Sequence, residues 1–380
     1  MDRRFFLTGV STLALSQLLA GCRTSNQATL NVHFLKNSIP AQLVGKFRHD
    51  FKFSLLLNLV PEPELANLFT QLQSWKVQPE SISRTVPTAS LVSLGDYWLT
   101  PAIEQGLIQP LNPTQLSHWN HLPSRWQSLV SRDGANDKLS VHQENLNSER
   151  QVWGAPYRWG TTVIAYRKDK FKPLGWAPSD WDDLWRPELK RRFSLLDHPR
   201  EVIGLTLKKM GHSYNSENIK SIPELAAELR ALNQQVKLYN SSAYLQPLVL
   251  GDTWLAVGWS TDILPIMRRN DQIRAVIPRS GTALWSDVWV RSASKHPEPD
   301  SGVGNQWIDF WWQPEVANQL SRFSNARSPI LTDFNPADNL TKSILLPDQQ
   351  VFDHSEFLKP LPAATIEQYR SLWQEIRTSS

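Results

Sequence analysis

The segment FKFSLLLNLVPEPELANLFTQLQSW, residues 51–75, contains two hydrophobic patterns in succession. Residues 51–59 form a nearly continuous apolar run, which is typical of a strand buried on both faces of a sheet. Apolar side chains then recur at the spacing of one helical face, at Leu65, Leu68, Phe69, Leu72 and Trp75. The segment therefore predicts a buried strand followed by an amphipathic helix.

The same alternation continues on both sides of this segment. Residues 29–35 are strand-like, a helix is expected to begin after Pro40, and residues 88–99 return as a buried strand ending in a glycine turn. Strands and helices in alternation predict a parallel sheet with right-handed crossovers. Because ligands of such sheets bind beyond the carboxyl ends of the strands, we expect a site near loops 36–39, 58–63 and 95–98.

A second alternating block follows. Strands are expected at 161–168, 191–197, 253–260 and 273–278, and the turn DHPRE at 197–201 leads into a helix. An aromatic helix is expected over 305–323, where Pro314 should kink or split it. The chain is thus long enough, and patterned enough, for two α/β lobes.

The amino terminus, MDRRFFLTGVSTLALSQLLAGC, has the layout of an export signal. Arg3 and Arg4 precede an apolar run that is too short and too polar to span a bilayer, so residues 1–21 are excluded from the fold. LAGC at 19–22 resembles a bacterial lipobox, which implies cleavage before Cys22, a lipid on its thiol and a tether over 22–28. RRFFL resembles a twin-arginine signal, and export by the Tat or the Sec route stays open.

Composition excludes several classes of function. Cys22 is the only cysteine, so the mature chain has no internal disulfide and no thiol nucleophile. Lys plus Arg number 40 against 36 Asp plus Glu, without a sustained basic stripe, which argues against a nucleic-acid partner. His118 and His121 have helical spacing but no evident third ligand, so no metal is predicted. We expect a protein that is not an enzyme and needs no cofactor.

The stretch GTALWSDVWVRSAS, residues 281–294, places a lone acid between two indoles. Asp287 lies in a strand-like run, where a buried carboxylate needs a partner. Trp289 is two strand steps farther on the same face and is expected to pack in the core. The residues alone allow either a core strand or an aromatic wall beside a carboxylate.

The segment WGAPYRWGTTVIAYRKDKF, residues 153–171, resembles the PYxWGTxxIxYN segment of the bacterial polyamine-binding proteins, the substrate-capturing subunits of spermidine and putrescine ABC transporters. Other segments follow the order of that family: SLVSLGDYWLTPAIEQGLIQPL before it, and WDDLWRPELKRRFSLLDHPREV, LGDTWLAVGWSTDI and ALWSDVWV after it. The likeness covers roughly residues 29–330. It implies an ABC permease as partner, a monomer, and a position on the periplasmic side of the cytoplasmic membrane, anchored through Cys22.

The resemblance also implies an α/β fold of the two-lobed periplasmic-binding-protein type II, with hinge strands between two mixed-sheet lobes. Lobe 1 would comprise residues 29–160 and 280–325, and lobe 2 residues 161–279. The segment 326–380 would pack across both lobes. Chain crossings are expected near 158–165 and 276–285, with the ligand trapped between the lobes by hinge closure.

Family members hold a polyamine by stacking its methylene chain on aromatic rings and pairing its ammonium groups with carboxylates. The resemblance assigns these roles to Asp96, Asp197 (or His198 in strict register), Glu201, Trp259, Trp285 and Asp287. Structural roles are the alternatives: helix caps for both Asp197 and Glu201, core packing for Trp259 and an Asx turn for Asp96. We expect Asp287→Asn to abolish amine binding with little loss of stability.

One loop departs from the family pattern. The family reads Y-N-W-T-E-Y where this chain reads HFLKNS at 33–38, so rings and an acid are replaced and Lys36 is introduced. Lys36 could pair with Asp96 or recognise an anionic group of a ligand. The same fold binding an anionic or ferric solute, or an envelope protein that has lost its ligand site, therefore remain alternatives to polyamine capture.

Overall fold

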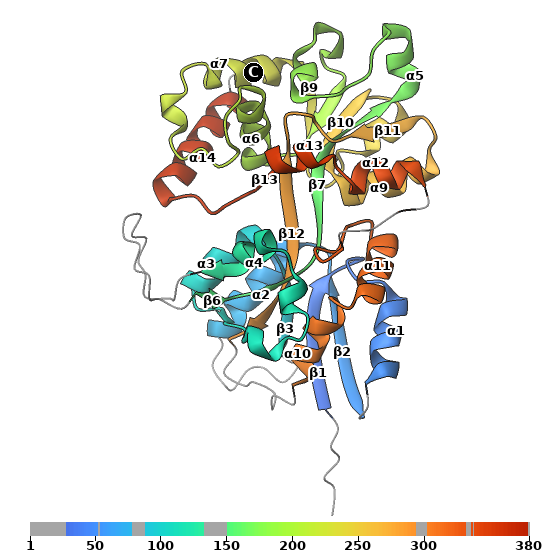
Figure 1. Cartoon of the computed structure of the whole chain (residues 1–380). Helices are drawn as coiled ribbons and strands as arrows, with labels where there is room; N and C mark the ends of the chain where they lie inside the picture. Colours follow the sequence, from blue (N-terminus) through green and yellow to red (C-terminus); the bar gives the residue numbers. More distant parts are fainter. Residues whose placement is uncertain are drawn as a thin grey trace, which may run out of the picture.

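The computed structural model describes residues 28–51, 54–77, 88–132, 150–293, 302–331, 336 and 338–378. Two α/β lobes are joined by two long strands, β7 (Ala155–Arg167) and β12 (Ala283–Ser292), which run side by side from one lobe into the other (Figure 1). The proposed signal at 1–21 and the proposed lipidation site Cys22 lie outside the described residues. Among the helices described, none is long and apolar enough to cross a membrane.

Lobe 1 is built on a parallel arrangement of three strands. β1 (Ala28–Leu35) pairs with β2 (Leu55–Glu62) and β3 (Leu91–Gly95), and β3 pairs antiparallel with β12. The connecting helices are α1 (Ala41–Asp50) and α2 (Leu65–Val77), followed by α3 (Leu99–Glu104), β4 (Ile108–Gln109), α4 (Ser124–Val130), β5 (Ser131–Arg132) and β6 (Gln151–Val152). The predicted strand–helix–strand order is confirmed here.

The prediction for residues 51–59 is wrong in one respect. The strand begins at Leu55 and lies at the edge of the sheet, where it pairs with β1, and Leu57 is its buried residue. Leu56 is exposed and Leu55 and Leu59 are only half-buried, so the apolar run did not indicate burial on both faces. The helix prediction is confirmed, because Leu68, Phe69 and Leu72 of α2 are buried.

Lobe 2 continues the sheet in the order β7–β10–β8–β9. β10 (Leu255–Trp259) runs antiparallel to β7 and parallel to β8 (Phe193–Leu195), and β8 runs parallel to β9 (Val236–Tyr239). β11 (Ile273–Val276) pairs with the far half of β7. The helices of this lobe are α5 (Lys168–Phe171), α6 (Pro199–Lys209), α7 (Leu225–Gln235), α8 (Gln246–Leu250), α9 (Ser260–Arg269), α12 (Asn339–Leu345) and α14 (Ala363–Thr378).

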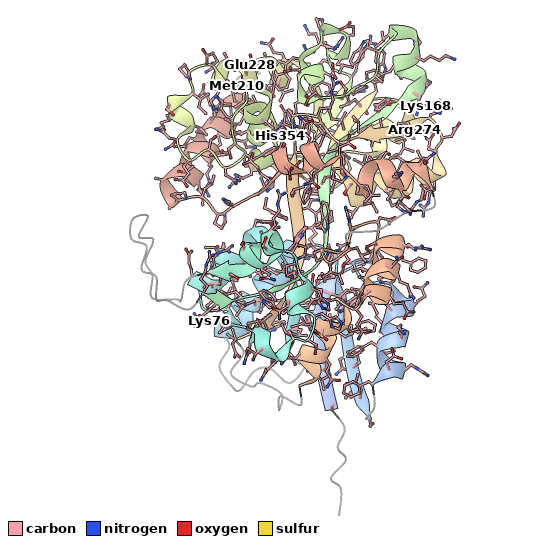
Figure 2. The ribbon with its side chains drawn as sticks, in the orientation of Figure 1. Lys76, Lys168, Met210, Glu228, Arg274 and His354 are labelled. Carbon is pink, nitrogen blue, oxygen red and sulfur yellow. The ribbon has the colours of Figure 1, made fainter. Side chains whose placement is uncertain are left out.

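Side chains fill both lobes, and Figure 2 shows Glu228 and Met210 on the part of lobe 2 where α6, α7 and α14 pack together. The segment after residue 325 also reaches lobe 1. Arg125 of α4 donates hydrogen bonds to the carbonyls of Phe352 in α13 (Gln349–His354) and Ser355, which precedes β13 (Glu356–Phe357). The predicted lobe boundaries themselves stay predictions.

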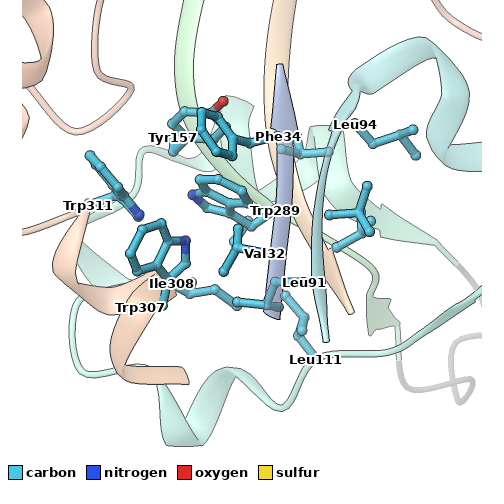
Figure 3. Close-up of a cluster of buried hydrophobic side chains, with 14 of the residues drawn as sticks. Val32, Phe34, Leu91, Leu94, Leu111, Tyr157, Trp289, Trp307, Ile308 and Trp311 are labelled. Carbon is cyan, nitrogen blue, oxygen red and sulfur yellow. The ribbon is translucent and has the colours of Figure 1, made fainter. Parts of the chain in front are cut away.

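The core of lobe 1 is rich in tryptophan (Figure 3). Trp289 is fully buried and stacks on Tyr157, with ring centroids 4.5 Å apart. Trp307 and Trp311 pack against it from α10 (Val303–Phe310) and the turn that follows. Core packing of Trp289 is thereby confirmed. Pro314 splits the predicted aromatic helix, because α11 (Pro314–Phe323) starts at that residue.

Candidate functional site at the junction of the lobes

The pairing of β7 with β12 determines which side chains meet at the junction. Asp287 lies opposite Arg158, and Trp285 lies opposite Gly160. A Cβ on Gly160 would meet Cζ2 of Trp285 at 2.3 Å, so the indole lies directly over the glycine backbone. The absence of a side chain at this position therefore allows the indole of Trp285 to lie close against β7.

Asp287 forms a buried ion pair that the sequence did not indicate. Arg158 donates from both Nε and Nη2 to Oδ2 of Asp287, each at 2.6 Å. The exposed fractions are 5% for Arg158 and 2% for Asp287. The adjacent carboxylate holds the pKa of Arg158 above its ordinary value against the effect of burial, whereas burial raises the pKa of Asp287 against the effect of Arg158. The two contacts at 2.6 Å favour the ionised pair.

The ion pair overturns one expectation about stability. We expected Asp287→Asn to cost little because the carboxylate was assigned to a ligand. The structure gives that carboxylate a resident partner, and removing one member of a buried pair leaves an uncompensated charge. The variant is therefore expected to be strongly destabilised.

Glu201 lies on the lobe 2 side of the junction, in the first turn of α6. It is buried and accepts hydrogen bonds from Thr162 Oγ1, at 3.2 and 3.1 Å. Burial raises its pKa to about 7, against the opposing effects of Thr162, of the nearby Trp259 side chain and of the charge of Arg200. The carboxyl group is thus only partly ionised at neutral pH and would gain from a cationic partner.

Asp96 begins the short 3-10 helix Asp96–Trp98 at the carboxyl end of β3. Its Oδ1 accepts the backbone N–H of Ser286 at 3.1 Å, so the side chain ties this loop to β12. Burial, opposed by this hydrogen bond and reinforced by nearby Asp287, raises the pKa of Asp96 to about 7. A structural contact is therefore present whether or not the residue also touches a ligand.

The remaining predicted residues differ in exposure. Trp259 at the end of β10 and Trp285 on β12 are both half-buried, so their rings are partly open to solvent. Asp197 is exposed, and its backbone N–H donates to Ser241 Oγ. Among the described residues, no recorded contact joins the Asp197 carboxylate to the other predicted site residues. Five of the six predicted residues thus belong to the junction strands or their immediate partners.

Two further junction residues were missed in the sequence. Tyr97, with 38% of its surface exposed, has its pKa raised to about 12 by burial and by the carboxylates of Asp96, Asp287 and Glu201. Its ring therefore lies within electrostatic reach of acids from both lobes. The signal was present, since Tyr97 directly follows the predicted residue Asp96. Arg158 had a weaker signal, as the variable position of PYxWGT.

Lys36 is exposed in the loop after β1. Within the described residues, no ion pair is recorded between Lys36 and Asp96, and no group of acids and histidines could hold a metal ion.

His118 instead pairs through Nδ1 with Asp309 at 2.8 Å. Asp309 lines a separate polar cavity of about 380 Å³ in lobe 1, which includes none of the predicted site residues.

A family model for bacterial extracellular solute-binding proteins matches residues 87–352. The chain belongs to this family. Its members are solute-binding proteins of transport systems rather than enzymes. The comparison with solved structures agrees: a spermidine/putrescine ABC transporter substrate-binding protein of Streptococcus pneumoniae superposes with a TM-score of 0.75 at 20% identity, covering 92% of this chain and 99% of that one. The predicted two-lobed type II fold is confirmed.

Two relatives in sequence are also named as solute-binding proteins. The spermidine/putrescine-binding periplasmic protein of Salmonella typhimurium is 24% identical over 368 residues, which cover 96% of each chain. A putrescine/cadaverine-binding protein of Pseudomonas aeruginosa is 28% identical over 238 residues, covering 59% of this chain and 66% of its own. This protein is a solute-binding component of a transport system.

Proposed function

We propose that this protein captures a small cationic amine between its lobes and delivers it to an ABC permease in the cytoplasmic membrane. The observation that carries the proposal is that four of the predicted residues lie on or directly beside the two joining strands. Trp285 and Asp287 belong to β12, whereas Glu201 and Trp259 both neighbour Thr162 of β7, through a hydrogen bond and through strand pairing respectively. Indole faces and carboxylates are the groups that bind ammonium ions. The relatives named above as putrescine- and spermidine-binding proteins support the same ligand class.

The strand crossing suggests how capture would work. β7 and β12 are long strands shared by both lobes, so small changes along them would swing one lobe against the other. An amine bridging groups from both lobes would favour the closed arrangement by its differential affinity for it. Glu201 from lobe 2 and Tyr97 from lobe 1 are the groups we assign to this bridge.

A second solute class is favoured by two cations near the site. Arg158 is buried beside Asp287, and Lys36 is exposed in the loop after β1. A carboxylate or phosphate could pair with either cation if the lobes closed over it. The first experiment therefore has to include anions as well as amines.

A thermal-shift panel on the exported protein tests the proposal. Putrescine, spermidine, cadaverine, simple primary monoamines, amino acids, inorganic phosphate, phosphorylated solutes and Fe(III) would each be added at millimolar and micromolar concentrations. A ligand at 100 times its dissociation constant stabilises the folded protein by about 2.7 kcal/mol, which gives a measurable rise in Tm. We expect a rise with at least one amine. A rise with anions alone would refute the amine assignment.

We also propose that the mature protein begins at Cys22 and is held on the periplasmic side of the membrane by lipid on that residue. The LAGC segment and the absence of any other cysteine in the sequence support this. Cys22→Ala is expected to release the protein into the soluble periplasmic fraction or to leave its signal uncut. Cell fractionation with mass spectrometry of the amino terminus distinguishes the outcomes, and unchanged membrane retention with normal cleavage would contradict the proposal.

A further inference from the structure

A cation of the protein itself lies where the proposed function needs a cation of the ligand. Arg158 and Asp287 are cross-strand neighbours on β7 and β12. The guanidinium contacts one carboxylate oxygen, Oδ2, through two nitrogens at 2.6 Å. Both side chains are almost completely buried, so this contact is screened little by solvent.

The same guanidinium also engages the aromatic wall. Cζ of Arg158 lies 5.7 Å from the ring centroid of Trp285, within the range of a cation–π interaction. The ring and the carboxylate that would bind an ammonium group therefore already share a positive charge. A ligand ammonium brought to this position would meet a like charge and an acid whose charge is neutralised.

The carboxylate on the lobe 2 side differs in its partners. Glu201 accepts hydrogen bonds from the hydroxyl of Thr162 and lies near the indole of Trp259, both uncharged, while the charge of Arg200 acts on it without a direct contact. Its sequence neighbour Arg200 directs its guanidinium to the carbonyls of Lys359 and Tyr214 and to Asn215 Oδ1. Among the described residues, no cationic side chain is recorded in a hydrogen bond or ion pair with the Glu201 carboxylate. Glu201 and Trp259 thus leave a position for one ligand ammonium.

We propose that Arg158 acts as a built-in ammonium substitute, filling the Trp285–Asp287 position and restricting the ligand to a single ammonium group, which binds at Glu201 and Trp259. The solute class is then a primary monoamine whose far end is uncharged, rather than a diamine or polyamine. The inference rests on the proposed amine-binding function and specifies the substrate of the same site. Arg158 is the specificity-determining residue.

Matched ligands of one chain length test the inference. Isothermal titration of the exported protein, purified in detergent, would compare 1-aminobutane and 4-aminobutan-1-ol with putrescine, which differs from the former by one terminal ammonium. We expect the wild-type protein to bind a monoamine at least as tightly as putrescine. Arg158→Gln keeps a hydrogen-bond donor beside Asp287 but removes the charge, and should improve the affinity for putrescine relative to 1-aminobutane by about tenfold or more.

Two controls make the result specific. Arg158→Lys retains a cation and is expected to keep the wild-type preference. The double variant Arg158→Gln with Asp287→Asn lacks the carboxylate that a second ammonium would need. It should therefore not show the improved affinity for putrescine that is expected of Arg158→Gln alone. Should Arg158→Gln fold poorly, the ratio of the wild-type affinities for putrescine and 1-aminobutane remains a test by itself.

The outcomes separate the inference from the proposed function. A wild-type preference for putrescine of more than about tenfold over 1-aminobutane, unchanged in Arg158→Gln, would refute the role of Arg158 while leaving amine binding intact; the ion pair would then be only a structural contact. No heat with any amine, in the wild-type protein or the variants, would remove both the inference and the amine-binding function on which it rests.

Discussion

Asp287→Asn is expected to lower the free energy of unfolding by about 3 kcal/mol at pH 7, because it leaves the buried guanidinium of Arg158 without a counter-charge. The asparagine oxygen can still accept one hydrogen bond, which places the loss at the lower end of the range for broken buried pairs. The measurement is the shift of the urea midpoint at unchanged slope. Amine binding is to be tested only at temperatures where the variant is folded.

A double-mutant cycle identifies the cause of this loss. Arg158→Met combined with Asp287→Asn removes the orphan charge and should recover most of the stability, giving a coupling energy of about 2 kcal/mol or more. Glu367→Gln is the matched surface control, because the pair Arg370–Glu367 is exposed on both sides and should cost less than about 1 kcal/mol. Equal losses in Asp287→Asn and Glu367→Gln would contradict the assigned strength of the junction pair.

Glu201→Gln is expected to have two opposite effects, a loss of amine affinity and a gain of stability at alkaline pH. A charge-assisted hydrogen bond to an ammonium group would be replaced by a neutral one, which should weaken binding by roughly 30-fold or more. Titration calorimetry with the tightest amine of the panel measures this effect. Unchanged affinity would exclude Glu201 from the ligand site.

The stability effect follows from the raised pKa of Glu201. An unfolded chain ionises this carboxyl group near pH 4.5, whereas the folded protein holds the proton until about pH 7. The folded state binds more protons between these values, so its stability falls as pH rises from about 4.5 to 7 and then levels off. The total loss from this group is about 3 kcal/mol. The glutamine of Glu201→Gln cannot ionise. The free energy of unfolding of this variant should therefore exceed that of the wild-type protein by a large amount at pH 8 and by a small amount at pH 5.

Two features make this comparison interpretable. Asp96 has a similarly raised pKa, so the pH dependence should be reduced rather than abolished in Glu201→Gln. Asp197→Asn is the matched control, since Asp197 is exposed and should alter stability by less than about 0.5 kcal/mol at either pH. A parallel shift of Glu201→Gln at pH 5 and pH 8 would contradict the raised pKa of Glu201.

Much of the architecture could be predicted from local pattern. The alternation of apolar runs with helical stripes gave the strand–helix order of lobe 1, and Pro314 marked the end of α10 before α11. These features depend on neighbours within one or two turns, which the sequence displays directly. The error at residues 51–59 arose because an apolar run does not reveal whether its strand is central or at the edge of a sheet.

The candidate site was predictable only in its parts. The residues Trp259, Trp285, Asp287 and Glu201 were found through an ordered set of motifs, each recognisable in a short stretch. Tyr97 directly follows Asp96 but is uncharged, so a pattern of carboxylates and indoles does not include it. Nothing in a one-dimensional pattern states which acid a given arginine faces.

Sequence by itself determined the family, the two-lobed fold and the carboxylates and indoles available to a ligand, because these depend on residue type and order. Tertiary structure alone decided that Asp287 is already paired and that the recorded hydrogen-bond donor to Glu201 is an uncharged hydroxyl, that of Thr162. The reason is strand register: residues 158 and 287 are separated by 129 positions along the chain, and the pairing of β7 with β12 brings their side chains into contact. Whether a buried charge has a partner so far away in the chain depends on strand pairing, which a local sequence pattern does not contain.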